Sequence, residues 1–218
     1  MSKYDEMIEG KVDMNINVVN NMQDTVSVTL TNEGTNKINI AINPKGKSLQ
    51  ELSIGEIFTN PLGDFIVLEH YDNGTTGIIR KEPLKKMRFG PNNDWRTSDV
   101  RKYLNDEYTA ELHKYFGRDN LTSHSVNLLS LDGLDDYGVS TDTVSLLTID
   151  QYRKYRNVLG ANLTSWWWLA TPDSTPSGNG ADYVLYVNSS GDVLYDGSCW
   201  CGGGVRPFLT LKSSTLIS

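Results

Sequence analysis

Hydrophobic and polar residues alternate along three short runs near the N-terminus, at residues 12–18, 26–30 and 38–42. A period of two is typical of strands with one buried and one solvated face, and the polar stretch NEGTNK between the last two runs predicts a hairpin. The Pro/Gly/Lys-rich stretch NPKGKS (43–48) predicts a boundary. Because an isolated hairpin is marginally stable, we expect residues 1–48 to form a β segment used for oligomerisation or attachment.

The hydrophobic pattern changes at residue 49, and we predict a second domain at residues 49–218. The stretches EIFTNPLGDFIVLEHY and TTGIIRKEPL read as two strands joined by a DNG turn. Apolar residues between positions 100 and 115 then recur at helical spacing, with Thr97 or Ser98 as the N-cap and Gly117 as the stop. This pattern predicts a long amphipathic helix.

A second, shorter helix follows. Thr148 and Gln151 have the spacing of a capping box, and IDQYRKYRNVL continues to Gly160. Short alternating runs, YVLYV and GDVLY, and a final strand, VRPFLTL, come after it. Helices segregated from antiparallel strands define an α+β domain, and no parallel βαβ repeat is indicated.

The net charge of −7 argues against a nucleic-acid partner, because phosphate binding requires clustered Lys and Arg. No apolar run approaches the roughly 18 residues that span a bilayer, so membrane insertion is not expected. The N-terminal MSKYDEMIEGKVDMN lacks the pattern of a signal peptide, and we therefore expect synthesis in a cytoplasm.

Catalytic and metal-binding signatures are sparse. His70, His113 and His124 are scattered and lack the spacing of a zinc site, and no nucleophile elbow, P-loop or GxGxxG is present. Cys199 and Cys201 would share one face of a strand and could bind a soft ion such as Cu(I), but two thiolates alone make an incomplete site. The interpretation as two small side chains on a loop stays open beside it.

Two further stretches have a structural and a functional interpretation. PNNDW (91–95) offers oxygen ligands for calcium, but Asn and Asp before a helix are ordinarily turn and cap residues. Trp166, Trp167 and Trp168 lie consecutively, and rings of this size most often fill a core, which we expect for at least two of them.

Four ordered motifs in residues 50–218 resemble those of a known family. NDWRTSDVRKYLNDEYTAEL resembles a W-x-x-S-x-x-R-x-[WY]-L-N helix, and SLLTIDQYRKY resembles an L-L-[ST]-x-x-[EQ]-x-x-x-Y segment. SWWWLATP is similar to a W-W-L-R-S-P motif, except that Ala170 and Thr171 replace the usual Arg-Ser, and GGVRPFLTL is similar to a G-V-R-P-[AF]-x-x-L strand. Together they resemble bacterial and phage C-type-lectin-like domains related to formylglycine-generating enzyme, which include the variable proteins of diversity-generating retroelements.

The resemblance implies a variable region at about residues 165–208. In such proteins template Asn codons scatter over a set that includes Asn, Ser, Tyr, Asp, Gly, Cys, Leu, Thr and Ala, and Leu169–Val205 contains no Lys, Glu, Gln, Met, Arg or His. A loop region rich in Gly and Ser would also disfavour long charged side chains, so that interpretation stays open. The implied ligand-contacting positions are Asp173, Ser174, Thr175, Ser177, Asn179, Asp182, Tyr183, Leu185, Leu194, Tyr195, Asp196, Ser198, Cys199, Trp200, Cys201, Gly202 and Gly203.

These observations predict a binding protein without catalytic residues, metal or cofactor, which displays a diversified surface to an unknown protein or glycan on a target cell. The resemblance implies a virion or cell-surface location, and the sequence leaves a homo-oligomer open. One alternative is a copper- and thiol-dependent oxidase of the formylglycine-generating type, although the spacing of Cys199 and Cys201 differs from the wider separation of that pair. A calcium-dependent sugar lectin is the other alternative, and its Glu-Pro-Asn and Trp-Asn-Asp triplets are absent from the sequence.

Overall fold

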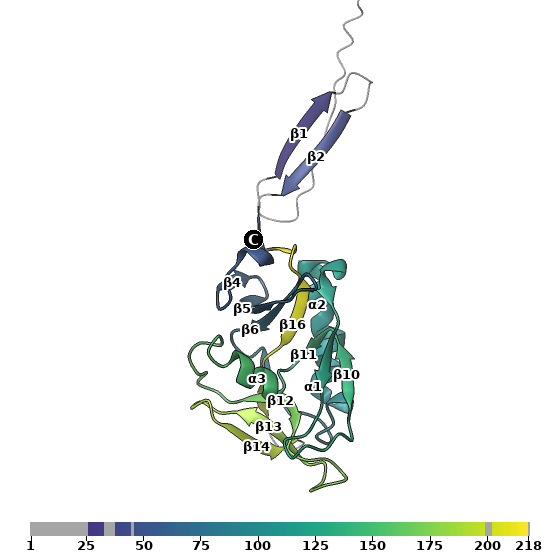
Figure 1. Cartoon of the computed structure of the whole chain (residues 1–218), viewed down its shortest axis with the longest axis vertical. Coiled ribbons are helices and arrows are strands. Elements are labelled where there is room, and N and C mark those ends of the chain that lie inside the picture. Colours follow the sequence, from purple (N-terminus) through teal and green to yellow (C-terminus); the bar gives the residue numbers. More distant parts are fainter. Residues whose placement is uncertain (1–25, 33–37, 45, 199–201, 218) are drawn as a thin grey trace, which may run out of the picture. The chain divides into compact units, whose positions relative to one another are not determined.

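A computed structural model of the protein describes residues 26–32, 38–44, 46–198 and 202–217 (Figure 1). The chain falls into two units, Met1–Lys45 and Gly46–Ser218. The second unit begins inside the stretch NPKGKS, and it is a mixed α+β structure made mostly of sheet.

The first unit contains one hairpin. Strand β1 (Val26–Asn32) pairs antiparallel with β2 (Ile38–Pro44), and the register runs from Val26 opposite Pro44 to Asn32 opposite Ile38. This confirms the hairpin predicted from the alternation at residues 26–30 and 38–42. The strand predicted at residues 12–18 lies outside the described residues.

The larger sheet of the second unit has six strands. Its path runs β11-β16-β6-β5-β4, and β8 also pairs with β16. The bounds are β4 (Ile57–Asn60), β5 (Gly63–His70), β6 (Thr75–Arg80), β8 (Leu121–Thr122), β11 (Val144–Ser145) and β16 (Phe208–Lys212). The predicted DNG turn joins β5 to β6, where the Asn73 side chain accepts hydrogen bonds from the backbone N–H and the hydroxyl of Thr75.

A second sheet of five strands runs β14-β13-β12-β15-β7. Its strands are β7 (Lys85–Met87), β12 (Trp167–Pro172), β13 (Tyr183–Val187), β14 (Val193–Gly197) and β15 (Gly203–Val205). The prediction of purely antiparallel sheets is wrong at one place, because β15 pairs parallel to β12 through Trp167 and Gly204. Side-chain alternation reports which face of a strand is buried and carries no information on strand direction, so the pattern could not predict this pair.

Smaller elements complete the second unit. Two short antiparallel pairs join β3 (Lys47–Ser48) to β17 (Leu216–Ile217) and β9 (His124–Asn127) to β10 (Val139–Asp142). Single 3₁₀ turns lie at η1 (Leu49–Glu51), η2 (Trp95–Thr97) and η4 (Arg118–Asn120). The β3–β17 pair joins the beginning of the second unit to its end by backbone pairing.

The long helix is present where the sequence predicts it, but it is not uniform. It consists of α1 (Asp99–Tyr103), a π-helical turn η3 (Leu104–Tyr108) and α2 (Thr109–Phe116). Ser98 caps it by accepting a hydrogen bond from Arg101, and Gly117 ends it at φ 81°, as expected. The π turn has a local cause, since both the N–H and the hydroxyl of Thr109 bond to the carbonyl of Leu104, five residues earlier.

The second helix, α3 (Ile149–Tyr155), is shorter than predicted. The capping box of Thr148 and Gln151 is confirmed. After Tyr155 the chain continues as turns to Gly160, whose φ of 76° suits glycine and not the other residues. The helical spacing of apolar residues continues past Tyr155 because these turns also bury side chains, such as Leu159, in the core.

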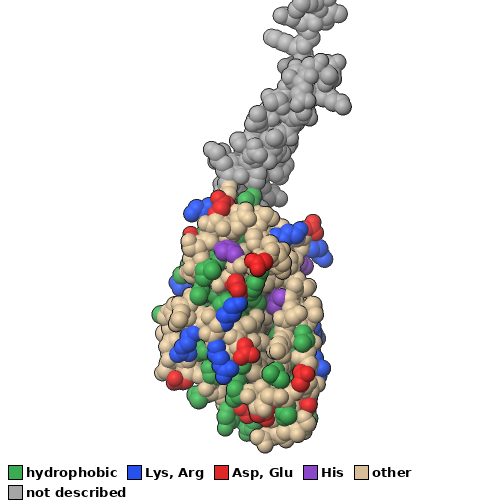
Figure 2. Space-filling view, in the orientation of Figure 1, with side chains coloured by type: hydrophobic (Ala, Val, Ile, Leu, Met, Phe, Trp, Pro, Cys, Tyr) green, Lys and Arg blue, Asp and Glu red, His purple; other side chains and the backbone are tan. Residues whose placement is uncertain are grey.

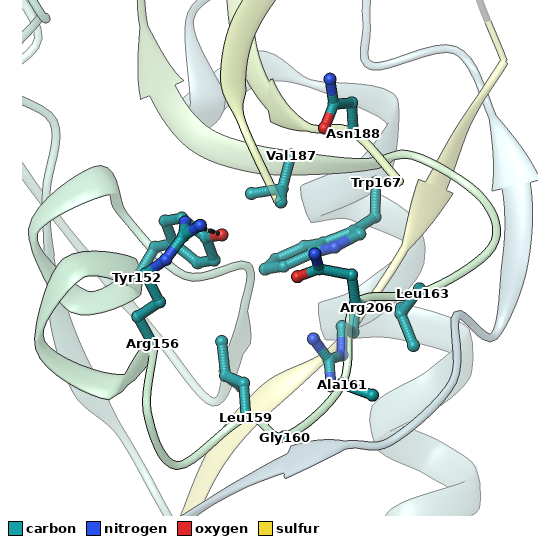
Figure 3. A pocket seen from close by; sticks show the side chains of 11 residues that line it. Tyr152, Arg156, Leu159, Gly160, Ala161, Leu163, Trp167, Val187, Asn188 and Arg206 are labelled. Atoms are coloured by element: carbon teal, nitrogen blue, oxygen red, sulfur yellow. Dashed lines mark hydrogen bonds between the residues drawn. The ribbon is translucent and has the colours of Figure 1, made fainter. Parts of the chain in front are cut away.

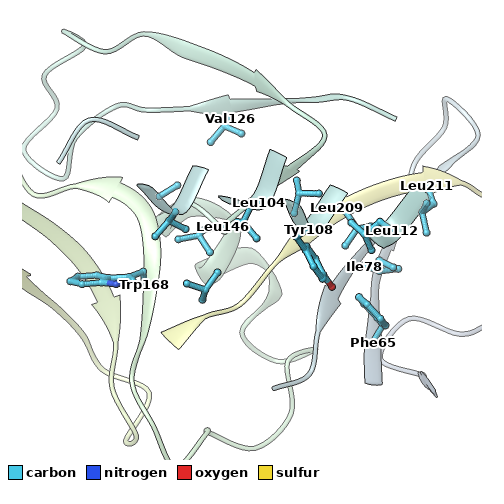
Figure 4. Close-up of a cluster of buried hydrophobic side chains, with 14 of the residues drawn as sticks. Phe65, Ile78, Leu104, Tyr108, Leu112, Val126, Leu146, Trp168, Leu209 and Leu211 are labelled. Atoms are coloured by element: carbon cyan, nitrogen blue, oxygen red, sulfur yellow. The ribbon is translucent and has the colours of Figure 1, made fainter. Parts of the chain in front are cut away.

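Hydrophobic side chains fill two clusters in the second unit. One cluster packs the long helix against the six-stranded sheet, with Leu104, Leu112 and Leu209 all fully buried (Figure 4). The other packs α3 against β12 and β13 and contains Trp167. Trp167 and Trp168 are 2% and 0% exposed, which confirms the expected core role.

Candidate functional site

The candidate site lies on the β13–β14 hairpin and on the loop that precedes it. The two strands pair in register, with Leu185 opposite Tyr195. Their connection is fixed locally, because the Asn188 side-chain oxygen accepts hydrogen bonds from the N–H groups of Ser190 and Asp192, and Gly191 adopts a φ of 81°. The middle of β13 is buried on both faces, at Val184 and Leu185, and the exposed positions of the hairpin lie at Tyr183 and on β14.

Two tyrosines project from the outer part of this hairpin. Tyr183 is 47% exposed and Tyr195 is 57% exposed, and their rings meet edge to face at 5.4 Å between centroids. Leu194 beside them is 46% exposed. In Figure 2 apolar and acidic side chains gather at the end of the second unit where β13 and β14 lie in Figure 1. Large exposed aromatic side chains are unusual on a surface that only contacts water, and they are favoured in binding surfaces.

A hollow of about 230 Å³ lies next to the tyrosine pair. Its lining consists of Asp173, Ser174, Asn179, Gly180, Tyr183 and Tyr195. All of these except Gly180 are among the positions predicted from the sequence. Residues from the loop and from both strands thus meet around one concave surface.

Asn93 holds the loop in place from beneath. Its side-chain N–H₂ donates to the carbonyls of Ser174 (2.9 Å) and Tyr183 (3.0 Å), one at each end of the loop. Its backbone N–H donates to the carbonyl of Ala181, and its side-chain oxygen accepts from the Tyr137 hydroxyl at 2.6 Å. Asn93 is fully buried, so this single amide fixes the loop without using any exposed loop side chain.

Two aspartates of the neighbouring 130–138 segment hold the loop from the side. Asp132 accepts hydrogen bonds from the hydroxyls of Ser130 and Ser174, and Asp136 accepts from the N–H and hydroxyl of Ser177. Each set of hydrogen bonds lowers the pKa of its carboxyl group, because the bonds stabilise the ionised form. The loop is therefore tied to charged partners through its serines.

Asp173 differs from these two aspartates. Burial raises the pKa of its carboxyl group, and the negative charge of Asp132 raises it further. Leu169–Val205 contains no Lys or Arg to offset these charges. The lining of the hollow thus combines one carboxyl group and two tyrosine rings with no Lys or Arg.

The predicted positions divide into two groups by exposure. Those exposed or half-buried are Asp173, Ser177, Asn179, Asp182, Tyr183, Leu194, Tyr195, Asp196 and Gly202. Cys199, Trp200 and Cys201 lie outside the described residues. The prediction of a shared contact surface is consistent with the first group, whose members come from the loop, the hairpin and the stretch before β15.

The other group is buried, and this part of the prediction is corrected. Ser174, Thr175, Leu185 and Ser198 are at most 3% exposed, and Gly203 is buried as well. Leu185 packs in the cluster between α3, β12 and β13, where Val184 on the opposite face of the strand is buried as well, and the hydroxyl of Ser174 donates to Asp132. These residues support the surface and expose little area to a ligand, although Ser174 contributes to the lining of the hollow.

Gly203 is restricted to glycine by its surroundings. A Cβ added there would lie 2.6 Å from Cε2 of Trp168, and the ring of Trp166 is equally close. Gly202, one residue earlier, has nothing within 4 Å of such a Cβ. Of the two predicted variable glycines, only Gly202 has room to vary.

The segment PNNDW is a structural element. Asp94 accepts the backbone N–H of Arg96 and forms an ion pair with its guanidinium at 2.8 Å, and Asn92 accepts the N–H of Asp94. With Asn93 bonded to Tyr137, the side-chain oxygens of all three residues are engaged within the protein. The turn-and-cap interpretation is confirmed.

The histidines do not assemble a site. The ring nitrogens of His70 bond to Thr76 and to the carbonyl of Leu52, and burial lowers the pKa of His124 to about 4. Within residues 26–32, 38–44, 46–198 and 202–217 no group of three or more His, Cys, Asp or Glu side chains could hold a metal ion. In the same residues no helix is long and apolar enough to cross a membrane.

A second, larger hollow was not predicted. It measures about 550 Å³ and is lined by Tyr71, Asn73, Thr75, Thr122, Ser123, His124, Ser125, Gln151, Phe208 and Thr210. These residues come from four separate stretches of sequence and share no motif. The support residues Asn93, Asp132 and Asp136 were also missed as loop anchors, although an Asn before a helix and an Asp-rich stretch were visible signals.

Residues 114–213 match the model of a domain of unknown function, DUF6273. No curated protein and no solved structure matches the chain. The matched range begins within α2 and ends after β16, so it includes the whole of the loop, the β13–β14 hairpin and their aspartate anchors.

Proposed function

We propose that this protein is a non-enzymatic binding protein with a C-type-lectin-like fold, whose exposed loop and β13–β14 hairpin recognise a protein or glycan on a target cell. In this proposal it is a receptor-binding component of a virus or phage, and the exposed positions are diversified by a retroelement. The observation that carries the proposal is the separation of roles at the hollow. The side chains of Tyr183, Leu194 and Tyr195 are about half exposed, while the buried Asn93 bonds to the backbone of the loop at Ser174 and Tyr183.

This division suits a replaceable surface. Loops that carry little core burial tolerate substitution, and tyrosine with small polar residues is the composition that binding loops of antibodies use. The two carboxylates of Asp173 and Asp182 together with the tyrosine rings favour a partner that presents basic groups, because cations are attracted both to carboxylates and to aromatic faces. The N-terminal hairpin would provide attachment, and several copies on one particle would add avidity.

A display experiment tests the proposal. A library of the full chain is randomised at Asp173, Asn179, Tyr183, Leu194 and Tyr195 and selected against a panel of unrelated proteins and glycans. The matched control library randomises five exposed apolar positions outside the site, namely Ile54, Ile57, Leu129, Leu131 and Val139. We expect folded, specific binders from the first library and few from the second. Equal yields from both libraries, or loss of folding throughout the first, would contradict the proposal.

The oxidase alternative is separated by a second experiment. The double variant Cys199→Ser/Cys201→Ser is compared with the unaltered protein for copper uptake and for binding of a selected target. We expect no stoichiometric copper uptake by either protein. Copper uptake that the double variant loses would favour the oxidase.

A further inference from the structure

A third, small polar cavity lies away from the proposed binding surface, between α3 and the β13–β14 turn. Its lining consists of Tyr152, Arg156, Leu159, Gly160, Ala161, Asn162, Leu163, Trp167, Val187, Asn188 and Arg206 (Figure 3). Its volume is about 20 Å³, enough for one water-sized species. We call it the Arg206 cavity.

Arg206 is the most constrained residue of this cavity. It is only 2% exposed, its Nε donates to the carbonyl of Arg80 at 2.9 Å, and its guanidinium lies 4.9 Å from the centroid of the Trp167 ring. Its Nη2 has no hydrogen-bond partner within the described residues. A buried guanidinium N–H without an acceptor is costly and calls for a partner.

No carboxylate of the described residues forms an ion pair with Arg206. Burial lowers the pKa of its guanidinium to about 10, and the more distant charge of Glu82 opposes that effect. Arg206 therefore stays positively charged at neutral pH. A negatively charged acceptor in the cavity would satisfy both the unpaired N–H and the unbalanced charge.

Arg156 adds a second positive charge to the same lining. Its Nη1 donates to the Tyr152 hydroxyl at 2.6 Å and to the carbonyl of Gly191 at 2.5 Å. Its Nη2 lies near the β13–β14 turn, since a Cβ added at Gly191 would be 3.0 Å from that atom. Figure 3 shows Tyr152 and Arg156 together on one side of the Trp167 ring. The lining contains two arginines and no acidic residue.

We propose that the Arg206 cavity binds a small monatomic anion such as chloride. The two guanidinium groups supply the charge and the donors, and the volume excludes phosphate or a carboxylate-bearing molecule. The bound ion would join the turn after α3 to β12 and to the β13–β14 turn, and so stabilise the sheet from which Tyr183 and Tyr195 project. The proposal does not depend on what that surface recognises.

The test measures thermal unfolding of the full chain in sodium chloride and in sodium gluconate at equal ionic strength, because gluconate is too large for the cavity. We expect the Tm to be about 5 °C higher in saturating chloride. Because salts also act non-specifically on stability, the quantity compared between proteins is the chloride-minus-gluconate difference. Arg206→Met removes the principal donor, but it also removes the bond to Arg80 and can abolish folding, so Arg156→Gln is the main variant. Arg153→Gln, an exposed arginine of α3 paired with Asp150, is the matched control.

The chloride-minus-gluconate difference in Tm should persist in Arg153→Gln and fall by at least half in Arg156→Gln. A bromide-soaked crystal of the unaltered protein should show an anomalous peak between Arg156 and Arg206. An equal difference in all three proteins, or a bromide derivative with no peak in the cavity, would overturn the proposal.

Discussion

Replacing Asn93 by Ala tests whether one buried amide holds the loop of the binding surface. The change removes three hydrogen bonds, two donated to the carbonyls of Ser174 and Tyr183 and one accepted from Tyr137. The carbonyl of Ser174 and the hydroxyl of Tyr137 lose a buried partner, while the carbonyl of Tyr183 keeps its bond from the N–H of Asp173. At about 1 kcal/mol per net hydrogen bond the loss is roughly 3 kcal/mol. For a chain of this size a loss of that order lowers the Tm by roughly 6–12 °C.

Urea unfolding gives the free energy of unfolding, and hydrogen exchange locates the effect. In Asn93→Ala the amides of Gly178 and Gly180 should exchange faster, because their bonds to the carbonyl of Thr175 exist only while the loop is anchored. The amides of β5 and β6 should lose protection only in proportion to global stability. Asn179→Ala is the control, since this exposed side chain makes no hydrogen bond within the described residues.

Two results would refute this reasoning. The first is an Asn93→Ala protein as stable as the Asn179→Ala control. The second is a loss of stability with no local increase in exchange between residues 174 and 183. Either would mean that the loop is held by its own turns and by the aspartates, and that the amide is incidental.

Three further predictions concern other residues of the second unit. Gly203→Ala should lose about 1–3 kcal/mol in urea unfolding because its Cβ meets two tryptophan rings, whereas Gly202→Ala should be neutral; equal costs would contradict the packing. Tyr195→Ala should change the free energy of unfolding by less than about 0.5 kcal/mol yet abolish target binding in a binder selected from the display library, as measured by surface plasmon resonance. Burial lowers the pKa of His124 from the ordinary 6.5 to about 4 and keeps the ring neutral, so stability should fall by about 3 kcal/mol as pH drops from 6.5 to 4. His124→Gln should lack that component in a pH series of urea unfolding, and an unchanged slope would exclude this origin.

The sign of the pH effect follows from proton counts. Between pH 4 and 6.5 the unfolded chain binds a proton at His124 that the folded protein excludes. The free energy of unfolding therefore rises with pH across this range, and the contribution of His124 is fully present above pH 6.5. Asp132 and Asp136, whose pKa values are lowered by hydrogen bonds, contribute in the same direction at lower pH. Asp173, whose pKa is raised, contributes in the opposite direction.

Local patterns predicted the elements well. The capping box of Thr148, the stop at Gly117 and the DNG hairpin are confirmed because each depends on residues within one or two turns of one another. The π turn was not predicted, since it arises from bonds of Thr109 that the apolar spacing does not report. The parallel pairing of β15 was missed because strand direction depends on the path of the whole chain.

The candidate positions between residues 173 and 203 were implied by the resemblance and its permitted residue set. Tyr183 and Tyr195, which this set includes, are exposed. The set could not separate them from Leu185 and Ser198, because neither codon set nor residue type reports which face of a strand is buried. Strand alternation of YVLYV places Leu185 on one face with Tyr183, but exposure does not follow it, because Val184 and Leu185 are both buried and Tyr183 lies at the end of the strand.

The most direct test of the central claim is to sequence this gene from many independent isolates of its source. We predict substitutions concentrated at the exposed positions, among them Asp173, Asn179, Tyr183 and Tyr195. The buried positions, such as Gly203 and Leu185, should be unchanged. Substitutions spread evenly along the chain, or as frequent at buried as at exposed positions, would contradict the claim that this surface is diversified for recognition.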